Sequence, residues 1–400
     1  MFAQRLAQVA ASATLKVAAE AERLRRAGVD VVDFSAGEPD FPTPAHVKAA
    51  GKAAIDANFT RYTAAAGIPE LREAICARYK RDYGIETTPA EVLVTAGGKQ
   101  ALFNSAFALF DPGDEVITHA PYWPTIPEQV KLVGATPVIV PTRSADGFAV
   151  HAEAMVAAIT PRTKAIIINS PCNPTGALVD EATVTAITDA AVTRGIWIII
   201  DLCYEQLIYE TVPHNLPKVL FDRHRNRTIL AGSASKAYAM TGWRCGWTIA
   251  PKDLTSAFNL IQGQTTSNIS SITQKAALAA VSGPQDAVTA MLNEYRERRD
   301  LIHERLTAHA GIQCVKPKGA FYLFPDISRL LSPNGLTSST EFAQALLEKE
   351  YVVVTPGEAF DAPGYLRISY ATSREQLREG ATRILRFAES LQPAKAVASR

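Results

Sequence analysis

SASKAYAMTGWRCGW, residues 233–247, contains one lysine in a stretch that short apolar runs precede and follow. Such runs predict buried strands, so Lys236 is expected on a partly desolvated loop between them. Burial disfavours an ammonium ion and leaves an amine that can condense with an aldehyde. Ser233 and Ser235 add hydroxyl groups and Arg244 adds a guanidinium fork, which together suit a phosphate dianion. The stretch therefore predicts an imine-forming nitrogen beside a phosphate site.

Pyridoxal 5'-phosphate carries both an aldehyde and a phosphate, so it is the cofactor that this stretch predicts. The alternative is that Lys236 is a solvated loop lysine and Arg244 a surface charge, because an isolated S-x-S-K match has little specificity. Independent groups elsewhere in the chain must decide between the two interpretations.

Length and charge restrict the class of partner. The chain has 400 residues, enough for two domains or for a large domain with a smaller one attached. Its 41 basic and 40 acidic residues nearly balance, so no long-range field attracts nucleic acid or an anionic membrane. The longest apolar runs, such as 165–168 and 196–200, are too short to span a membrane and predict buried strands. A small-molecule partner is expected, with no nucleic acid and no membrane.

The cysteines indicate a reducing compartment. There are five of them, scattered and without a C-x-x-C pair, which argues against a disulfide framework and against a metal site. A cytoplasmic location is therefore expected. Arg5 and Lys16 precede the first acidic residue, Glu20, but no apolar core of a secretory signal is present, so the first residues are expected to belong to the mature protein.

An α/β alternation begins at about residue 90. Short β-branched runs alternate with longer helical stretches, which predicts a mainly parallel sheet covered by helices on both faces. Polar or aromatic groups follow five consecutive runs: Gly97–Lys99, Tyr122–Trp123, Asn173, Asp201 with Tyr204, and Lys236. Ligands of open α/β sheets gather at the carboxyl ends of the strands. This convergence is the independent support that the lysine stretch requires.

The pattern changes after about residue 280. A long charged helix over 287–309, a strand pair formed by 319–324 and 352–355, a strand over 365–370 and a closing helix predict a smaller α+β domain. The expected division is an N-terminal arm with part of the small domain over 1–44, a large cofactor-binding domain over 45–285 and a small domain over 286–400. Within the turn-rich loop 35–44, Gly37 lets the backbone approach a ligand closely; a plain connector is the equal alternative.

Asp201 ends an apolar strand, where a buried carboxylate is costly unless it faces a cation. The pyridinium nitrogen of the cofactor is such a cation, and keeping it protonated makes the ring an electron sink. The alternative is that Asp201 caps a following helix. Tyr204 and Asn173 can donate to the phenolate oxygen beside the imine. For Asn173 the alternative is turn formation in the N-P-T-G stretch.

Further groups suit the remaining parts of the ligand. Trp123 offers a ring face for stacking, although a single tryptophan also suits a core. The Gly97–Gly98–Lys99 turn opens a helix and offers backbone N–H groups to a phosphate. Arg367 lies in the middle of a predicted strand, where an unpaired charge would be costly and the carboxylate of an amino acid would match it.

Taken together, these motifs resemble the class I aminotransferases of fold type I, and among them the bacterial aspartate aminotransferase subgroup. The resemblance extends from about residue 12 to 390. It is carried by SAGEPDF (35–41), YTAAAGIPELR (62–72), TAGGKQALFN (95–104), APYW (120–123), NSPCNPTGA (169–177), DLCYE (201–205), residues 233–247, GAFY (319–322) and YLRISYA (365–371). It implies a large domain with a mainly parallel seven-stranded sheet between helices, plus a smaller α+β domain. Where many relatives read D-E-x-Y, this chain has Asp201-Leu-Cys-Tyr204.

The resemblance also implies roles for individual residues. Lys236 would be the Schiff-base lysine, Asp201 would face the pyridine nitrogen, and Tyr204 and Asn173 would face the phenolate oxygen. The implied phosphate contacts are Ser233, Ser235, Arg244 and the amides of Gly98 and Lys99. The implied substrate contacts are Arg367 at the α-carboxylate, with Gly37, Trp123, Asn173 and Lys99. Tyr62 would reach the phosphate of the neighbouring subunit of a homodimer, and Ser12–Thr14 resembles the N-terminal arm of the bacterial subgroup.

The leading interpretation is a ping-pong aminotransferase of amino-acid metabolism, in which Lys236 moves the α-proton as acid and base. The Lys99 ammonium, with hydroxyls of Ser12 and Thr14, would favour aspartate or glutamate with 2-oxoglutarate or oxaloacetate. If only the Lys99 backbone is used, an aromatic, prephenate or alanine-type substrate is favoured. A C–S lyase on the same fold is a second enzyme reading. A regulator is disfavoured, because about 30 residues precede SAGEPDF and no helix-turn-helix candidate is among them.

Overall fold

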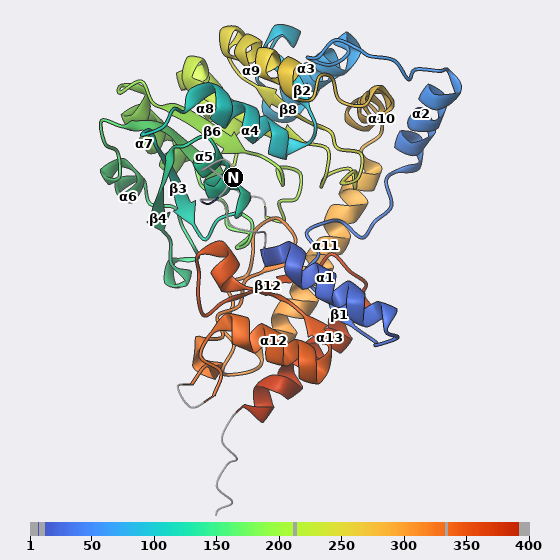
Figure 1. Cartoon of the computed structure of the whole chain (residues 1–400), viewed down its shortest axis with the longest axis vertical. Coiled ribbons are helices and arrows are strands. Elements are labelled where there is room, and N and C mark those ends of the chain that lie inside the picture. Colours follow the sequence, from blue (N-terminus) through green and yellow to red (C-terminus); the bar gives the residue numbers. More distant parts are fainter. Residues whose placement is uncertain (1–6, 8–12, 211–213, 333–334, 392–400) are drawn as a thin grey trace, which may run out of the picture. The chain divides into compact units, whose positions relative to one another are not determined.

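The computed structural model describes residues 7, 13–210, 214–332 and 335–391. They form two compact units (Figure 1). The large unit comprises Glu38–Asn293 and Lys318–Ala320, and the small unit comprises 13–37, Glu294–Pro317 and 321–391. The three-part division expected from the sequence stays a prediction.

A seven-stranded sheet forms the middle of the large unit. Its strand order is β2-β8-β7-β6-β5-β3-β4. The strands are β2 (Val92–Thr95), β3 (Glu115–Ala120), β4 (Thr136–Pro141), β5 (Thr163–Asn169), β6 (Trp197–Asp201), β7 (Thr228–Ser233) and β8 (Gly246–Ile249). Only β8 runs antiparallel to its neighbours β2 and β7; the other adjacent pairs are parallel. The mainly parallel seven-stranded sheet implied by the resemblance is confirmed.

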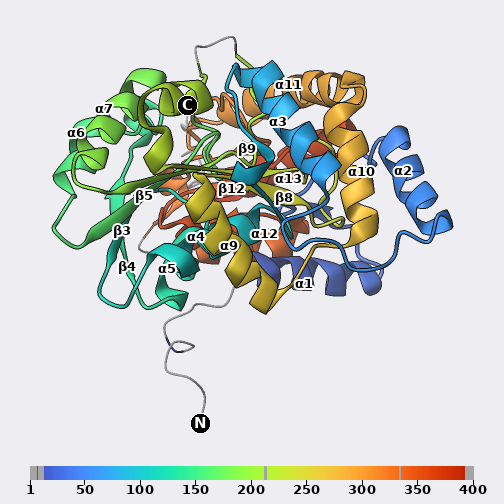
Figure 2. The same cartoon turned by 90° about the horizontal axis from the view of Figure 1, so that it is seen from above.

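Helices cover both faces of this sheet because its strands are apolar on both sides. In β5, Ile166 and Ile168 pack into one core, while Ala165 and Ile167 pack into the other. The first core is closed by α2 (Ala45–Asp56), α3 (Pro69–Tyr83), α6 (Ala152–Ala157), α7 (Glu181–Val192), α8 (Leu216–His224) and α10 (Ser271–Ser282). The second is closed by α4 (Gly98–Leu109), α5 (Thr125–Leu132) and α9 (Lys252–Thr265), which Figure 2 shows together on one side of the strands. This is the period-two pattern of a sheet buried on both faces.

The small unit is an α+β structure, as its element order predicts. Its helices are α1 (Ala13–Arg26), most of α11 (Asp286–Thr307), α12 (Ser339–Glu350) and α13 (Arg374–Ser390). Its strands are β1 (Val32–Asp33), β9 (Tyr322–Leu323), β10 (Val352–Val353), β11 (Thr355–Pro356) and β12 (Leu366–Ser369). They form a parallel pair β1-β10 and an antiparallel sheet β11-β12-β9.

The expected pairing of 319–324 with 352–355 is wrong. Within these segments β9 pairs with β12, and β10 pairs with β1 from the N-terminal part of the chain. Phe34 extends the connection, because its N–H donates to Val353 O at 2.8 Å and its carbonyl accepts from Ser369 N at 2.8 Å. Strand partners so distant in sequence are selected by tertiary packing, which local patterns do not report.

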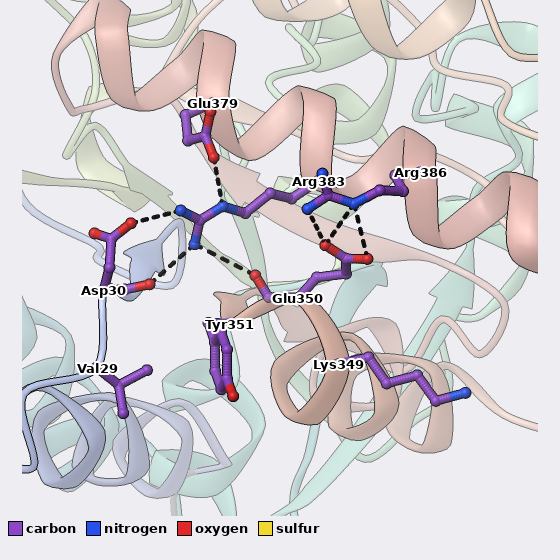
Figure 3. Close-up of a pocket in the computed structure, with 8 residues that line it drawn as sticks. All are labelled: Val29, Asp30, Lys349, Glu350, Tyr351, Glu379, Arg383 and Arg386. Carbon is purple, nitrogen blue, oxygen red and sulfur yellow. Dashed lines mark hydrogen bonds and ion pairs between the residues drawn. The ribbon is translucent and has the colours of Figure 1, made fainter.

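Ion pairs attach this N-terminal segment to the C-terminal helix (Figure 3). The Arg383 guanidinium on α13 pairs with Asp30 at 2.5 Å and with Glu379 at 2.7 Å, and also donates to Asp30 O at 2.9 Å. Arg386, one turn later, pairs with Glu350 at the end of α12. These residues line a surface pocket, and both of its arginines are paired with carboxylates of the small unit, which favours a structural role for the pocket.

Among the residues that the structure describes, no helix combines the length and the apolar character needed to cross a membrane.

Candidate active site

A glycine-lined cradle lies at the N-terminus of α4 in the large unit. Gly97 has φ +80°, and a Cβ on it would lie 2.5 Å from Nη2 of Arg244. A Cβ on Gly246 would lie 2.5 Å from the backbone nitrogen of Gly98. A Cβ on Gly98 would lie 3.5 Å from Cβ of Ser233. The turn before α4, the end of β7 and the start of β8 therefore meet here, and at Gly97 and Gly246 the approach leaves no room for a side chain.

The groups that meet in the cradle are hydrogen-bond donors. The N-cap residue of α4 is Gly97, which has no side chain to accept hydrogen bonds from the first helical turn. The backbone N–H groups there, at the positive end of the helix dipole, can therefore donate to an anion. Arg244 is held in place because its guanidinium donates to Thr241 O at 2.9 Å and to Ala96 O at 3.3 Å. Ser233 Oγ accepts from the N–H of Ser235 at 3.1 Å. Amides at a helix N-terminus, hydroxyls and a guanidinium fit a phosphate dianion.

Asp201 is the last residue of β6 and is only 3% exposed. Burial raises the pKa of its carboxyl to about 6, while the N–H of Cys203 and the charge of Lys236 lower it. Its Oδ1 accepts from Cys203 N at 3.0 Å. The alternative reading as a helix cap is wrong, because turns follow Asp201 and the next helix, α8, begins at Leu216. A buried carboxylate close enough to Lys236 to interact with its charge is a partner for a ligand cation.

Lys236 is half-buried on the loop after β7, whereas Arg244 is exposed. The interaction of Lys236 with Asp201 favours the functional interpretation of this lysine over that of a solvated loop residue. Cys203 belongs to the stretch Asp201-Leu-Cys-Tyr204, which differs from the D-E-x-Y of many relatives. Its thiol stays protonated because burial raises its pKa to about 12. This difference in sequence therefore places no thiolate charge beside Asp201.

Asn173 is connected to Asp201 through the end of β5. The side chain of Asn169 accepts from Asn173 N at 2.8 Å and donates to the carbonyl of Asp201 at 3.4 Å. Both Asn173 and Tyr204 are buried, at 5% and 4% exposure. Three of the expected groups, Asn173, Asp201 and Tyr204, therefore lie on two adjacent strand ends, as the parallel order of β5 and β6 requires.

Lys99 and Trp123 lie against each other. The Lys99 ammonium is 5.1 Å from the centre of the Trp123 ring, a cation–π contact. Partial desolvation, and then the charge of Arg244, lower the pKa of Lys99. Its backbone carbonyl accepts from Gln129 at 3.0 Å. Trp123 is half-buried and packs against the edge of the second core, so its ring is anchored on one side.

Arg367 and Gly37 belong to the small unit and are described there. Arg367 on β12 is 4% exposed, and its Nη2 donates to Ser35 O at 2.8 Å. The guanidinium carbon lies 4.5 Å from the ring centre of Tyr322 and 5.0 Å from that of Phe360. A Cβ on Gly37 would lie 3.3 Å from the hydroxyl of Tyr322. Gly37 and Arg367 are therefore both neighbours of Tyr322 within one unit.

The remaining expected residues are Tyr62 and the two hydroxyl residues of the N-terminal arm, Ser12 and Thr14. Tyr62 is 91% exposed on the loop before α3. Ser12 and the side chain of Thr14 lie outside the described residues.

A buried polar cluster beside the site was missed by the sequence interpretation. The Glu205 carboxylate accepts from Arg78 Nη2 at 2.6 Å, from the hydroxyl of Tyr83 at 2.8 Å and from that of Tyr79 at 3.2 Å. Trp247 on β8 donates to the Tyr79 hydroxyl at 3.2 Å. Glu205 follows Tyr204 directly, so this cluster anchors the turn that carries Asp201 and Tyr204. The motif DLCYE contained the signal for Glu205, but nothing local marked Arg78.

Comparisons with known proteins identify the family. The family model described as aminotransferase class I and II matches residues 29–384. The chain therefore belongs to this family, and it is an aminotransferase.

The chain is also similar to individual aspartate aminotransferases. It is 45% identical to the aspartate/prephenate aminotransferase of Cereibacter sphaeroides, over 96% of this chain and 98% of that protein. It is 42% identical to the aspartate aminotransferase of Geobacillus stearothermophilus, over 97% and 99%. A solved structure of the Thermus thermophilus aspartate aminotransferase with maleate has a TM-score of 0.91 at 42% identity, covering 97% of this chain and 99% of that one. The Rhizobium meliloti enzyme has a TM-score of 0.92 at 39% identity, again over 97% and 99%. Membership of the family implies pyridoxal phosphate as the cofactor, and the donors of the cradle fit its phosphate.

Proposed function

We propose that the chain is a pyridoxal-phosphate-dependent transaminase that moves an amino group between aspartate or glutamate and a 2-oxo acid by a ping-pong mechanism. The observation that carries the proposal is the glycine-lined cradle, whose Ser233 precedes Lys236 by three residues on a strand end next to that of Asp201. Ser233, Ser235, Arg244 and the amides of Gly98 and Lys99 would hold the cofactor phosphate. Tyr204 and Asn173 would hold its phenolate oxygen and Trp123 its ring face.

When bound, the cofactor supplies an electron sink that stabilises negative charge at the α-carbon of the amino acid. Asp201 would remain ionised against the ring nitrogen and keep a proton on it. The amine Nζ of Lys236 would take the proton from the substrate α-carbon as a base and deliver it as an acid to the carbon that carries the cofactor's aldehyde oxygen when the cofactor is free. Arg367 would bind the α-carboxylate by two parallel hydrogen bonds, near Gly37.

The substrate preference rests on two observations. Relatives with 45% and 42% identity are named aspartate/prephenate aminotransferase and aspartate aminotransferase. The Lys99 ammonium lies over the face of Trp123, where it is partly desolvated and would attract a distal carboxylate. Prephenate is a second candidate, because the Cereibacter sphaeroides protein is named for it as well.

The active unit would be a homodimer in which Tyr62 of one copy donates to the phosphate bound by the other. Its high exposure fits a side chain that a second copy covers. A cytoplasmic location and a role in amino-acid metabolism complete the proposal.

The test is a panel of half-reactions, in which the loss of the visible absorbance of the loaded enzyme is followed with each amino acid. Aspartate and glutamate should react fastest, with phenylalanine and alanine as comparison substrates; a preference for alanine would contradict the proposed specificity. Product analysis with and without 2-oxoglutarate separates transamination from the C–S lyase alternative. A lyase would release a thiol, ammonia and a 2-oxo acid from a cysteine-type substrate and water, without any 2-oxo acid acceptor.

A further inference from the structure

The loop that carries Tyr62 is exposed at its tip but anchored by buried side chains along its length. The side chains that anchor the loop are Gln262 on α9 and Ser271 and Gln274 on α10. These helices follow the loop by about two hundred residues in the chain. Tyr62 itself is 91% exposed, and Thr60 and Arg61 before it are exposed too. We call residues 59–68 the Tyr62 loop.

Gln274 binds both sides of this loop. It is 0% exposed in α10. Its Oε1 accepts from the backbone N–H of Ile68 at 2.7 Å. Its Nε2 donates to the hydroxyl of Thr63 at 2.9 Å and to Ile269 O at 3.0 Å. One amide therefore connects the residue after Tyr62 to the residue at the start of α3.

Gln262 holds the middle of the same loop. It is also 0% exposed, on α9, and its Nε2 donates to Ala65 O at 2.7 Å and to Val94 O at 2.9 Å. Its Oε1 accepts from Asn104 on α4 at 3.1 Å. The loop is thus fastened through Gln262 to β2 and to α4, the helix whose first turn forms the cradle.

Close packing reinforces these hydrogen bonds. Gly67 has φ +100°, and a Cβ there would lie 2.6 Å from Cγ2 of Val94 and 3.5 Å from Oε1 of Gln274. The backbone of the loop also bonds directly, because Ala66 O accepts from Val94 N at 3.0 Å. At the other end, the hydroxyl of Ser271 donates to Phe59 O at 2.7 Å.

A buried amide is costly unless its hydrogen bonds are made, and a network whose bonds are made makes a segment rigid. The buried amides of Gln262 and Gln274 hold a loop whose tip exposes the Tyr62 side chain to solvent. Preformed geometry of this kind reduces the entropy lost when the tip binds a partner.

We propose that Gln262 and Gln274 are positioning residues that preform the Tyr62 loop, so that Tyr62 of one copy of the chain completes the cofactor site of a second copy. The inference rests on the proposed function, in which Tyr62 contacts the phosphate held by the other subunit. Among the described residues, Gln274 bonds the loop and Ile269 but no residue of the cradle, so a defect in Gln274 should act on the neighbouring subunit's site and leave the site of its own chain intact.

The test uses mixed dimers with two different purification tags and one active site each. One subunit carries Lys236→Ala, so turnover comes only from the other subunit's lysine. Gln274→Met, which keeps the length of the side chain and removes its hydrogen bonds, is placed either on the Lys236→Ala subunit or on the active subunit. For each dimer, kcat and the Kd of pyridoxal phosphate at the active site are measured.

With Gln274→Met on the Lys236→Ala subunit, the active site should bind the cofactor about tenfold more weakly. With Gln274→Met on the active subunit, the Kd should match that of the dimer carrying only Lys236→Ala. Equal weakening in both arrangements, or weakening only in the second, overturns the proposal. Thr63→Val, which removes one bond at the loop itself, is measured in the same two arrangements and should show the same asymmetry if Gln274→Met does not fold.

Two control variants separate the possible failures. Gln285→Met removes amide bonds to Ala280 O and Gly283 O, at 3.0 and 2.8 Å, away from the loop, and should leave the Kd unchanged in both arrangements. Tyr62→Phe replaces Gln274→Met in a parallel set of dimers. If Tyr62→Phe has no effect from the neighbouring subunit, the shared site of the proposed function fails. If it has an effect there and Gln274→Met and Thr63→Val do not, only the positioning role fails.

Discussion

Replacing Asp201 by asparagine should stabilise the cofactor-free protein at neutral pH, although it disables the loaded enzyme. Asp201 is 3% exposed, and burial raises the pKa of its carboxyl from 3.8 to about 6. Each unit of pKa corresponds to about 1.4 kcal/mol, so the fold pays about 3 kcal/mol to keep this carboxyl ionised. Asparagine carries no charge, and its side-chain oxygen can still accept from Cys203 N as Asp201 does at 3.0 Å.

The pH range follows from the sign of the shift. Between pH 4 and pH 6 the folded carboxyl is protonated while the unfolded one is ionised, so folding takes up a proton and stability falls as the pH rises. Above pH 6 the penalty is complete, and below pH 4 it vanishes. His119 acts in the opposite direction, because burial lowers its pKa to about 4, but both variants contain it, so its contribution cancels in their difference.

The measurement is equilibrium urea unfolding of both cofactor-free proteins at pH 4 and pH 7.5, at equal protein concentration. Relative to the difference at pH 4, Asp201→Asn should gain about 2 to 3 kcal/mol at pH 7.5. A difference that does not change with pH would refute the reasoning. In the loaded enzyme the order should reverse, because a neutral amide cannot hold the proton on the ring nitrogen, and kcat should fall far more than cofactor affinity.

The remaining predictions concern three further positions. Lys236→Ala should abolish turnover but retain noncovalent cofactor, because the cradle is unchanged; borohydride treatment followed by mass spectrometry should find no cofactor attached to the variant, and persistent attachment would contradict the assignment. Lys99→Ala should lower kcat/KM for aspartate by roughly 2 to 5 kcal/mol and for alanine very little, whereas equal losses would show that this lysine does not select the side chain. Arg78→Met should cost about 3 to 5 kcal/mol of unfolding free energy, because it leaves Glu205 buried without its cation, and adding Glu205→Gln should recover part of that loss. Thermal and urea unfolding of the two variants measure this, and a double variant no more stable than Arg78→Met would argue against the charge explanation.

The sheet and the groups at its strand ends were predictable from sequence. Runs such as 165–168 and 196–200 are apolar at every position, which in short segments indicates strands buried on both faces, and β5 and β6 are such strands. Asn173, Asp201 and Lys236 follow successive runs, and parallel strands bring their carboxyl ends to one edge. The roles of Lys236, Asp201 and Arg367 were argued from the chemistry of their side chains, whereas that of Tyr62 came from the family resemblance alone. All of these roles remain proposals.

Local patterns also failed at identifiable places. The pairing of 319–324 with 352–355 was wrong because β1, three hundred residues away, is the partner of β10. A two-residue strand leaves too little periodicity to select its neighbour. The helix-cap alternative for Asp201 could not be decided from the sequence either. An aspartate precedes turns as readily as it caps helices, and only the structure shows that turns follow it.

The sequence by itself determined the family, the lysine and the strand runs that the polar groups follow, since each motif and each run consists of residues that lie close together in the chain. The tertiary structure decided which distant side chains support them. Arg78 reaches Glu205 across 127 positions at 2.6 Å, and Gln274 reaches Ile68 across 206 positions at 2.7 Å. On their own helices an arginine and a glutamine are ordinary surface residues. They become buried partners only because the packing of helix against sheet removes water from them, and hydrogen bonds between distant segments must then replace it.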